Sequence, residues 1–511
     1  MNNQEMFRSL IVVAAMIGAL PALVRAQYTG IYTFDSQGDA CCAGHADLMA
    51  QGQDGNLYGT MPTGVSSTYY GTWFEYPIGG QPMIHNLSGG PFQPKAGLTL
   101  GIDGNLYGAT VHGGPNNYGM LVKVSNGVMT PIYTFTGGAG GSYPNAPPIQ
   151  GPDGNLYGVT NDGSTSGHVY QFLTASGTLG WVVPLPSGSD APLILASDGN
   201  FYGTFPHGNL PVNGVAGSNN NGGAVFQVTP SGVLSGVYNI GTNTGDGQVP
   251  WGPVMQGSDG NLYGTASGGG AYNGGVVFQL TLSHVYKVIH SFQSPDGTDP
   301  EGGLVQGSDG FFYGLTSRDG WFQQLWVHGG GPLFKAGGTL FKVDSTGANF
   351  SRLFTFTAYI SNDVGSGMAP LATPTIHTNG LIYGLTSLGG FTGNGQAPGT
   401  QGAFDDGGEL FSFNAGLKPF VSVVGQRSAH VGDRVSIIGQ GFLNATGIRF
   451  GNGSVPWTKQ AVSIWSDNYM TVTVPSGATT GPVTVTETTG TLSTPYNFTI
   501  PCTFLYCLHL P

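Results

Sequence analysis

The chain has 511 residues, enough for several domains or for one large repeat array with an appendage. Glycine supplies 90 residues and charged residues only 8%, against about 25% in an average globular protein, while 39% are hydrophobic. This composition excludes collagen, because the glycines have no three-residue period. It also excludes a disordered chain, and it is typical of an all-β protein with many turns. The net charge of −12 comes without any cluster of lysine and arginine, so no nucleic-acid partner is expected.

Residues 1–26 have the features of an export signal. Arg8 precedes the apolar stretch 10–20, and small residues near Ala26 suit a signal peptidase. A transmembrane anchor needs about 20 apolar residues, and Pro21 and Arg25 end this stretch too early. We therefore expect a cleaved signal peptide, no integral membrane segment after cleavage, and an extracellular or cell-surface location.

The body of the chain repeats the phrase Asp-Gly-Asn-Leu-Tyr-Gly. Seven copies begin at Asp54, Asp103, Asp153, Asp198, Asp259, Asp309 and Asn379. Their tyrosines are separated by 49, 50, 45, 61, 50 and 70 residues, which is the period of propeller blades rather than of helical solenoids. Each copy divides into four short strands, A to D; in the fifth these are 253–256, 261–265, 275–281 and 285–292.

The two ends of the array complement each other. The seventh copy ends after its third strand, 408–413, while the spare strand 30–34 resembles the D strands 132–135 and 353–356. We therefore predict a seven-bladed β-propeller closed by the N-terminal strand, which leaves no open sheet edge. The alternative, an open β-solenoid, does not predict that a spare strand at one end of the array matches the strand missing at the other end.

The phrase itself is interpreted as scaffold. Asp-Gly between two apolar strands predicts a type I′ hairpin turn, which needs positive φ at both central residues. The alternative is a calcium loop, but Asn379 lacks the charge and no copy has the further acidic residues that such a site requires. We expect the tyrosine to fill the space between neighbouring blades and the glycine after it to permit a close backbone approach.

Four cysteines allow three disulfide pairings in an oxidising compartment. They are Cys41, Cys42, Cys502 and Cys507. A staple between tail and body or a local 502–507 loop is favoured over a vicinal redox pair at 41–42. Their spacing matches no metal site.

Together with Gly-x-Val-Phe-x-Leu-Thr and a Tyr-x-Phe before a Gly-rich link, the phrase resembles the bacterial extracellular Gloeobacter/Verrucomicrobia repeat family (GloVer, choice-of-anchor tandem repeat) over residues 28–414. That family implies a surface-associated repeat without assigned enzymatic residues. Residues 432–442, 448–451, 472–478 and 481–485 resemble an IPT/TIG domain, and their alternation independently predicts an immunoglobulin-like β-sandwich. The expected domains are the signal peptide 1–26, the propeller 27–416, the IPT/TIG domain 417–500 and a Cys-containing tail 501–511.

Candidate ligand-binding residues lie on the face opposite the Asp-Gly turns, where the loops between strands B and C vary in length. Five residues after each tyrosine the series reads Thr63, His112, Asp162, His207, Gly268, Arg318 and Leu388. His112, Asp162, His207 and Arg318 are the polar candidates at the channel mouth, although neighbouring blades are about 10 Å apart. Aromatic candidates suited to stacking on sugars or anchoring a protein are Trp251, Trp321, Phe322 and Trp326.

No nucleophile elbow, phosphate-binding loop, dinucleotide fingerprint or zinc-protease motif is present. We therefore assign no catalytic residue, metal ligand or cofactor. The leading hypothesis is a non-enzymatic extracellular protein that binds a glycan or cell-envelope component through the variable loops. One alternative is a secreted propeller enzyme, a polysaccharide lyase or hydrolase acting at the channel mouth. The other is a purely architectural envelope protein.

Overall fold

A computed structural model describes residues 27–35, 48–62, 71–87, 93–163, 166–212, 222–318, 336–357, 369–387 and 406–501. In these ranges the secondary structure consists of β-strands and two short 3₁₀ turns, η1 (Gly138–Gly140) and η2 (Phe442–Asn444), with no α-helix. No helix among them could cross a membrane. The predicted signal peptide and all four cysteines lie outside the described residues.

The repeats form seven four-stranded antiparallel sheets in the described part of the chain. Sheets one to four consist of β2 (Ala50–Gln51), β3 (Leu57–Met61), β4 (Thr72–Tyr76) and β5 (Met83–Asn86); β6 (Leu98–Leu100), β7 (Leu106–Thr110), β8 (Met120–Ser125) and β9 (Val128–Thr134); β10 (Ile149–Gln150), β11 (Leu156–Thr160), β12 (Gly167–Leu173) and β13 (Thr178–Leu185); and β14 (Ile194–Leu195), β15 (Phe201–Phe205), β16 (Ala224–Val228) and β17 (Leu234–Asn239). Sheets five to seven consist of β19 (Met255–Gln256), β20 (Leu262–Ala266), β22 (Val276–Leu280) and β23 (Tyr286–Ser291); β24 (Val305–Gln306), β25 (Phe312–Thr316), β26 (Ala336–Val343) and β27 (Phe350–Thr357); and β28 (Thr375–Ile376), β29 (Ile382–Leu385), β30 (Asp406–Phe413) and β1 (Tyr28–Asp35). A further ribbon pairs β18 (Gly247–Gln248) with β21 (Gly268–Gly269).

The second strand of each sheet, which carries Leu-Tyr-Gly or its equivalent, is buried along its whole length. An alternating pattern would bury only one face. These strands are buried on both faces because neighbouring sheets cover them, as in a stack of blades. The fourth strands are more exposed.

The turn between the first two strands differs from the predicted type I′ turn. In sheet five, the N–H of Gly260 donates to the carbonyl of Gly257 (3.0 Å) and the N–H of Gly257 donates to that of Asn261 (2.8 Å). Gly260 has φ +83°, whereas Asp259 is not among the residues with positive φ. This is a three-residue hairpin loop with a left-handed glycine at its end. The prediction of a type I′ turn was wrong because the residue before the phrase belongs to the loop as well.

The repeated tyrosines fill the cores between consecutive sheets, as predicted. Tyr263, for example, lies with Phe312 and Phe341 of the next sheet and is fully buried. Equivalent cores join each consecutive pair, and one contains Tyr383 of sheet seven together with Leu57 and Phe74 of sheet one. The contacts between sheets therefore continue from the last sheet to the first.

The glycine after each tyrosine permits a close approach, but to a side chain rather than to another blade's backbone. A Cβ on Gly264 would lie 2.5 Å from Cζ of Phe278, its cross-strand neighbour in the same sheet. Phe341 lies over Gly314 in the same way. Only glycine leaves room for the aromatic ring at this position.

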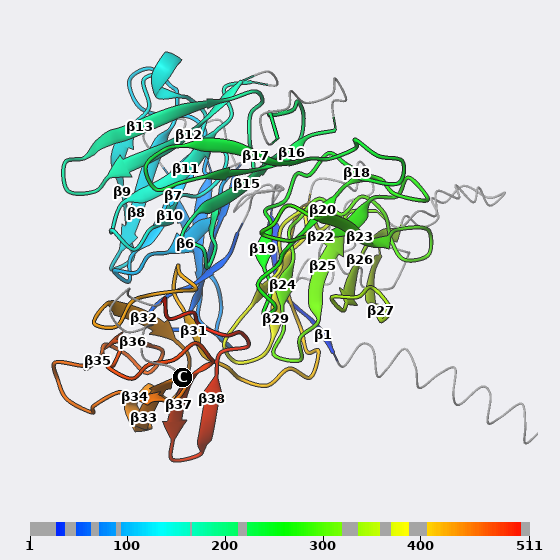
Figure 1. The fold of residues 1–511 in the computed structure, drawn as a ribbon. Coiled ribbons are helices and arrows are strands. Elements are labelled where there is room, and N and C mark those ends of the chain that lie inside the picture. Colours follow the sequence, from blue (N-terminus) through cyan, green and yellow to red (C-terminus); the bar gives the residue numbers. More distant parts are fainter. Residues whose placement is uncertain are drawn as a thin grey trace, which may run out of the picture.

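The predicted N-terminal strand is present as β1, which pairs antiparallel with β30. Figure 1 shows this blue strand beside the yellow strands of sheet seven. Phe34 from β1 is fully buried in the core that contains residues of both sheet one and sheet seven. The Gln51 side chain adds hydrogen bonds of 2.9 and 3.0 Å to Thr378. The two ends of the array are therefore joined by backbone pairing, apolar packing and a side-chain bridge.

Residues 422–493 form two further four-stranded sheets that enclose a separate core. One contains β31 (Ser422–Val423), β32 (Arg434–Ile438), β36 (Tyr469–Thr473) and β35 (Val462–Ile464); the other contains β34 (Gly453–Ser454), β33 (Ala445–Phe450), β37 (Val483–Glu487) and β38 (Gly490–Ser493). Val435 and Ile437 on β32 and Met470 and Val472 on β36 belong to this core, and the residues between them do not, as in the predicted sandwich.

This sandwich packs against the turn face of the repeat sheets, below them in Figure 1. Tyr469 Oη and Ser436 Oγ donate to the carbonyl of Ile102, at 3.0 and 2.5 Å. Other contacts reach Gln53, Gln256, Ser308 and Thr378. These residues belong to sheets one, two, five, six and seven or to their turns, so the sandwich covers much of the turn face.

Candidate functional site

The polar candidates lie where the second strand of a sheet ends, away from the Asp-Gly turn. His112 follows β7, Asp162 follows β11, His207 follows β15 and Arg318 follows β25. Each of the four contacts a residue on the link that leads into its own sheet or the next one. The loops after the second strands and the links between sheets therefore share one face, which we call the loop face.

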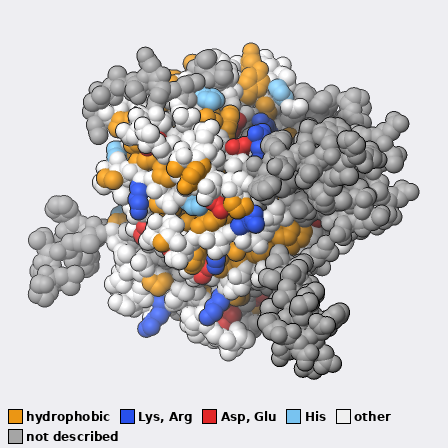
Figure 2. Space-filling view, turned by 90° about the vertical axis from the view of Figure 1, so that its right-hand side faces the viewer, with side chains coloured by type: hydrophobic (Ala, Val, Ile, Leu, Met, Phe, Trp, Pro, Cys, Tyr) orange, Lys and Arg blue, Asp and Glu red, His pale blue; other side chains and the backbone are white. Residues whose placement is uncertain are grey.

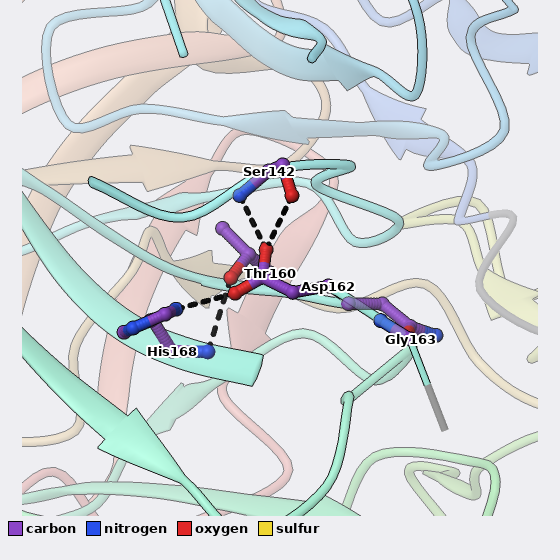
Figure 3. A network of polar contacts seen from close by, with 6 residues as sticks. Ser142, Thr160, Asp162, Gly163 and His168 are labelled. Atoms are coloured by element: carbon purple, nitrogen blue, oxygen red, sulfur yellow. Dashed lines mark hydrogen bonds and ion pairs between the residues drawn. The ribbon is translucent and has the colours of Figure 1, made fainter. Parts of the chain in front are cut away.

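Asp162 is the centre of a polar network (Figure 3). Its Oδ1 accepts hydrogen bonds from the backbone N–H of Ser142 and from Ser142 Oγ, the latter at 2.7 Å. Its Oδ2 lies 2.5 Å from Nδ1 of His168 on β12. The side chain of Asp162 is 14% exposed and that of His168 is 15% exposed. The network ties the link before sheet three to two strands of that sheet.

The order of these three residues argues against acyl-transfer chemistry. In a Ser-His-Asp triad the imidazole lies between the hydroxyl and the carboxylate, so that it can take the hydroxyl proton. Here the carboxylate lies between Ser142 and His168, and the serine hydroxyl donates to Asp162 (Figure 3). The geometry holds the loop in place and does not activate a nucleophile.

The two histidines each pack edge-on against an aromatic ring. His112 lies 5.5 Å from the ring of Tyr143, and His207 lies 5.8 Å from the ring of Trp251. In both, Nδ1 is buried and has no hydrogen-bond partner among the described residues. Of the aromatic candidates, Trp251 is thus placed beside His207 on the loop face, whereas Trp321, Phe322 and Trp326 lie outside the described residues.

Arg318 forms an ion pair with Asp299, with 3.0 Å between Nη1 and Oδ2, and its side chain is 62% exposed. Burial raises the pKa of Asp299, and the charge of Arg318 opposes that shift. Asp299 has φ +55° and precedes Pro300, a strained conformation for a non-glycine residue. The exposed part of the arginine remains available to a partner.

The four polar candidates do not contact one another; each is engaged by a neighbour within its own part of the loop face. Sequence reasoning missed the residues that do meet between sheets. Asp190 accepts hydrogen bonds from Asn145 (2.7 Å) and Asn161 (2.6 Å), which joins the links before sheets three and four. Asn145 and Asp190 share one place in the repeat, eight residues before the aspartate of the phrase, and this was the available signal.

The aspartates of the repeated phrase are also engaged. The tyrosine Oη donates to the aspartate Oδ2 in six copies, at 2.6–2.9 Å, and the N–H two residues after the aspartate donates to Oδ1. This favours the scaffold interpretation over the calcium loop. Among the described residues, no group of three or more His, Cys, Asp or Glu side chains could hold a metal ion.

On the face drawn in Figure 2, positively and negatively charged side chains are mixed. Lysine and arginine side chains lie there among acidic, hydrophobic and uncharged ones.

Two family models match the chain. The Gloeobacter/Verrucomicrobia repeat matches residues 45–215 and 187–398, and the IPT/TIG domain matches residues 419–500. The chain belongs to the Gloeobacter/Verrucomicrobia repeat family. The resemblance noted from the phrase is thus confirmed, and both modules fit a cell-surface binding or structural role. No curated protein matches the chain.

Solved structures similar to this repeat-family chain include β-propellers. The putative TolB from Agrobacterium tumefaciens is 14% identical, with a TM-score of 0.35, over 65% of this chain and 94% of that one. The β-propeller domain of the Trilobed protease from Pyrococcus furiosus is 9% identical, with a TM-score of 0.40, over 73% and 93%. The gluconolactonase XC5397 from Xanthomonas campestris is 13% identical, with a TM-score of 0.35, over 76% and 98%. Similarities at this level concern the fold alone.

Proposed function

We propose that this protein is exported and acts as a non-enzymatic binding protein at the cell surface or outside the cell. Its ligand is a glycan of the cell envelope, bound by the loop face of a closed seven-bladed propeller. Cleavage after residue 26 would leave one mature chain. It consists of a propeller (27–416), an IPT/TIG domain (417–500) and a short tail with two of the four cysteines.

Three observations support a closed ring of seven blades. Seven apolar cores each contain residues of two consecutive sheets, including sheets seven and one. β1 completes sheet seven from the other end of the repeat array. The Gln51–Thr378 bridge adds a polar contact at the same junction. Closure of this kind removes unpaired sheet edges.

The packing of the sandwich carries the assignment of the binding face. Tyr469, Ser436 and their neighbours occupy the turn face, so we place the binding site at the opposite end of the repeat sheets, on the loop face. The same face carries Trp251 beside His207 and the exposed part of Arg318. An aromatic ring next to polar side chains suits a sugar, whose ring presents C–H groups on its face and hydroxyls at its edge.

The hydrogen bonds and ion pairs of the polar groups on the loop face favour a binding role over catalysis. Asp162 is held by Ser142 and His168 in an order unsuited to proton transfer from the serine. Arg318 and Asp299 neutralise each other. The described residues of the loop face thus offer contacts rather than an activated nucleophile or a pair of free carboxylates.

Retention on immobilised envelope polysaccharides tests the proposal. The mature chain should be retained, and Trp251→Ala should weaken retention several-fold. Trp181→Ala is the matched control, because Trp181 lies on β13 and bonds to the carbonyl of Pro230, away from the residues of the loop face. Equal retention of the wild type and Trp251→Ala, or no retention of either, would overturn the proposal.

A further inference from the structure

A second cluster of exposed polar and aromatic side chains lies on the sandwich, outside the loop face. Trp465 is 65% exposed, which is unusual for the largest apolar side chain. It follows β35 directly, next to the joint where Ser466 bonds to the carbonyl of Gln53 in the repeat domain. Its exposed surface is therefore accessible to a ligand.

The indole is held in a fixed orientation. Its Nε1 donates to Thr471 Oγ1 on the neighbouring strand β36, at 3.2 Å. Its backbone N–H donates to the carbonyl of Tyr469, at 3.0 Å, which closes the turn between β35 and β36. A ring fixed in this way loses little conformational entropy when a ligand stacks on it.

A guanidinium shares the same acceptor. Arg434 on β32 donates to Thr471 Oγ1 from Nε (3.1 Å) and from Nη2 (2.7 Å). Nη2 also donates to Ser463 Oγ on β35, at 2.5 Å. Because Thr471 Oγ1 receives both groups, the indole edge and the guanidinium lie side by side on the outer face of one sheet. We call Trp465, Arg434, Ser463 and Thr471 the sandwich platform.

One nitrogen of the Arg434 guanidinium has no hydrogen bond within the described part of the chain. Nη1 makes no hydrogen bond among the described residues, and no carboxylate there lies within ion-pair distance of Arg434. The platform thus offers an apolar plane, free N–H donors and two hydroxyls. This combination matches a pyranose ring, which stacks through its C–H face and accepts hydrogen bonds at neighbouring hydroxyls.

The net charge of the protein favours a neutral sugar over an acidic one. Asp433 precedes Arg434 and Asp467 follows Trp465 by two positions, and the whole chain carries a net charge of −12. The net negative charge of the chain disfavours acidic polysaccharides. A neutral polysaccharide avoids that cost and still uses the free N–H groups.

We propose that the sandwich platform is a second carbohydrate site, which binds a neutral polysaccharide by stacking one pyranose ring on Trp465 and donating hydrogen bonds from Arg434. It does not depend on the loop face being a glycan site. Two sites at separate places on one chain would hold it on an extended polymer more firmly than either site alone.

Titration of the full mature chain with soluble neutral hexasaccharides (gluco-, xylo- and manno-), followed by tryptophan fluorescence and calorimetry, tests this. At least one should bind, and Trp465→Ala should weaken binding roughly tenfold, which corresponds to about 1.4 kcal/mol, because the stacking surface is lost. Arg434→Ala should weaken it as well. Trp457→Ala is the matched control, because Trp457 is 45% exposed in the same domain but precedes β35 rather than following it.

Other outcomes would overturn the proposal. These are unchanged affinity in Trp465→Ala, binding of oligogalacturonate but of no neutral sugar, or self-association in sedimentation velocity that Trp465→Ala abolishes, which would make the platform a contact between two copies. Trp251→Ala separates the two sites: it should leave this titration unchanged while weakening retention through the loop face. Circular dichroism of each variant checks that the sandwich is still folded.

Discussion

Tyr263 Oη donates a 2.6 Å hydrogen bond to Asp259, four residues before it, so the ring that fills the core between two sheets also braces the turn of its own hairpin. Burial, followed by this hydrogen bond, raises the pKa of Tyr263 well above its usual range, and the phenol therefore stays protonated as a donor. The same link recurs in five other copies. The repeated phrase thus couples turn geometry to packing between sheets.

Tyr263→Phe should destabilise the protein while keeping the ring in place. Loss of a hydrogen bond to a carboxylate costs about 1–2 kcal/mol, measured as the free energy of unfolding in urea. Tyr383→Phe is the matched control, because its partner Asn379 is neutral and more distant, at 3.3 Å. It should cost about half as much or less. Equal losses in both variants would contradict a special role of the aspartate.

Removal of calcium should not affect the repeat domain. The turn aspartates already accept hydrogen bonds from a tyrosine and a backbone N–H, so their oxygens are not free for a metal. Excess EGTA should change the melting temperature by less than about 1 °C. A fall of several degrees that is reversed by added calcium would show that the turns bind the ion after all.

Gly264→Ala should be strongly destabilising for a local steric reason. The new Cβ would lie 2.5 Å from Cζ of the fully buried Phe278, and overpacking of this kind costs about 1–3 kcal/mol. Gly268→Ala is the control, because its nearest neighbour is 3.6 Å away and its backbone is not left-handed. Gly264→Ala combined with Phe278→Leu should cost less than the sum of the two single changes.

The periodic parts of this fold could be predicted from the sequence, because they follow from repetition. Seven copies in similar context revealed the hairpin, the tyrosine as a filler between sheets and the four-strand unit. The spare strand at 30–34 was visible because it resembled the D strands, and β1 pairs with β30 accordingly. The copies of a repeat can be compared with one another in the sequence, so the features that they share can be inferred without a structure.

The contacts that occur once could not be predicted in this way. His168 meets Asp162 only because β12 returns beside β11, and nothing in the spacing marks that pair. The packing of Tyr469 against Ile102 joins residues 367 positions apart. The Tyr263–Asp259 bond was missed for another reason, since the tyrosine was expected to fill the space between blades and its hydroxyl was not assigned a partner.

Phe34→Ala tests whether β1 is a full member of sheet seven. Phe34 is fully buried between the first and last sheets, and such truncations cost about 3–5 kcal/mol. Phe135 occupies the corresponding place after β9 and is equally buried. Phe34→Ala and Phe135→Ala should therefore destabilise alike in urea unfolding. A much smaller effect at Phe34 would indicate that β1 is only loosely attached.

The same junction should make stability depend on pH. Glu409 on β30 is 3% exposed, and its Oε2 accepts a 2.8 Å hydrogen bond from Tyr28 on β1. Burial raises the pKa of Glu409 to about 7, although the bond from Tyr28 opposes this. An unfolded glutamate has a pKa of about 4.3, so the folded state favours the protonated form. This contribution to stability is complete below pH 4.3 and is lost as the pH rises through 7.

Glu409→Gln should remove that dependence, because the amide keeps the shape of the protonated carboxyl without its charge. The wild type should lose about 1–3 kcal/mol more than the variant between pH 5 and pH 8 in urea unfolding. The two proteins share all other titratable groups, so the difference between them isolates Glu409. Because Glu409 on β30 pairs with Thr33 on β1, the protection factors of the β1 amides, which correct for base-catalysed exchange, should also fall above pH 7 in the wild type alone. Parallel pH profiles would show that the carboxyl is ionised in the folded protein and that another group neutralises it.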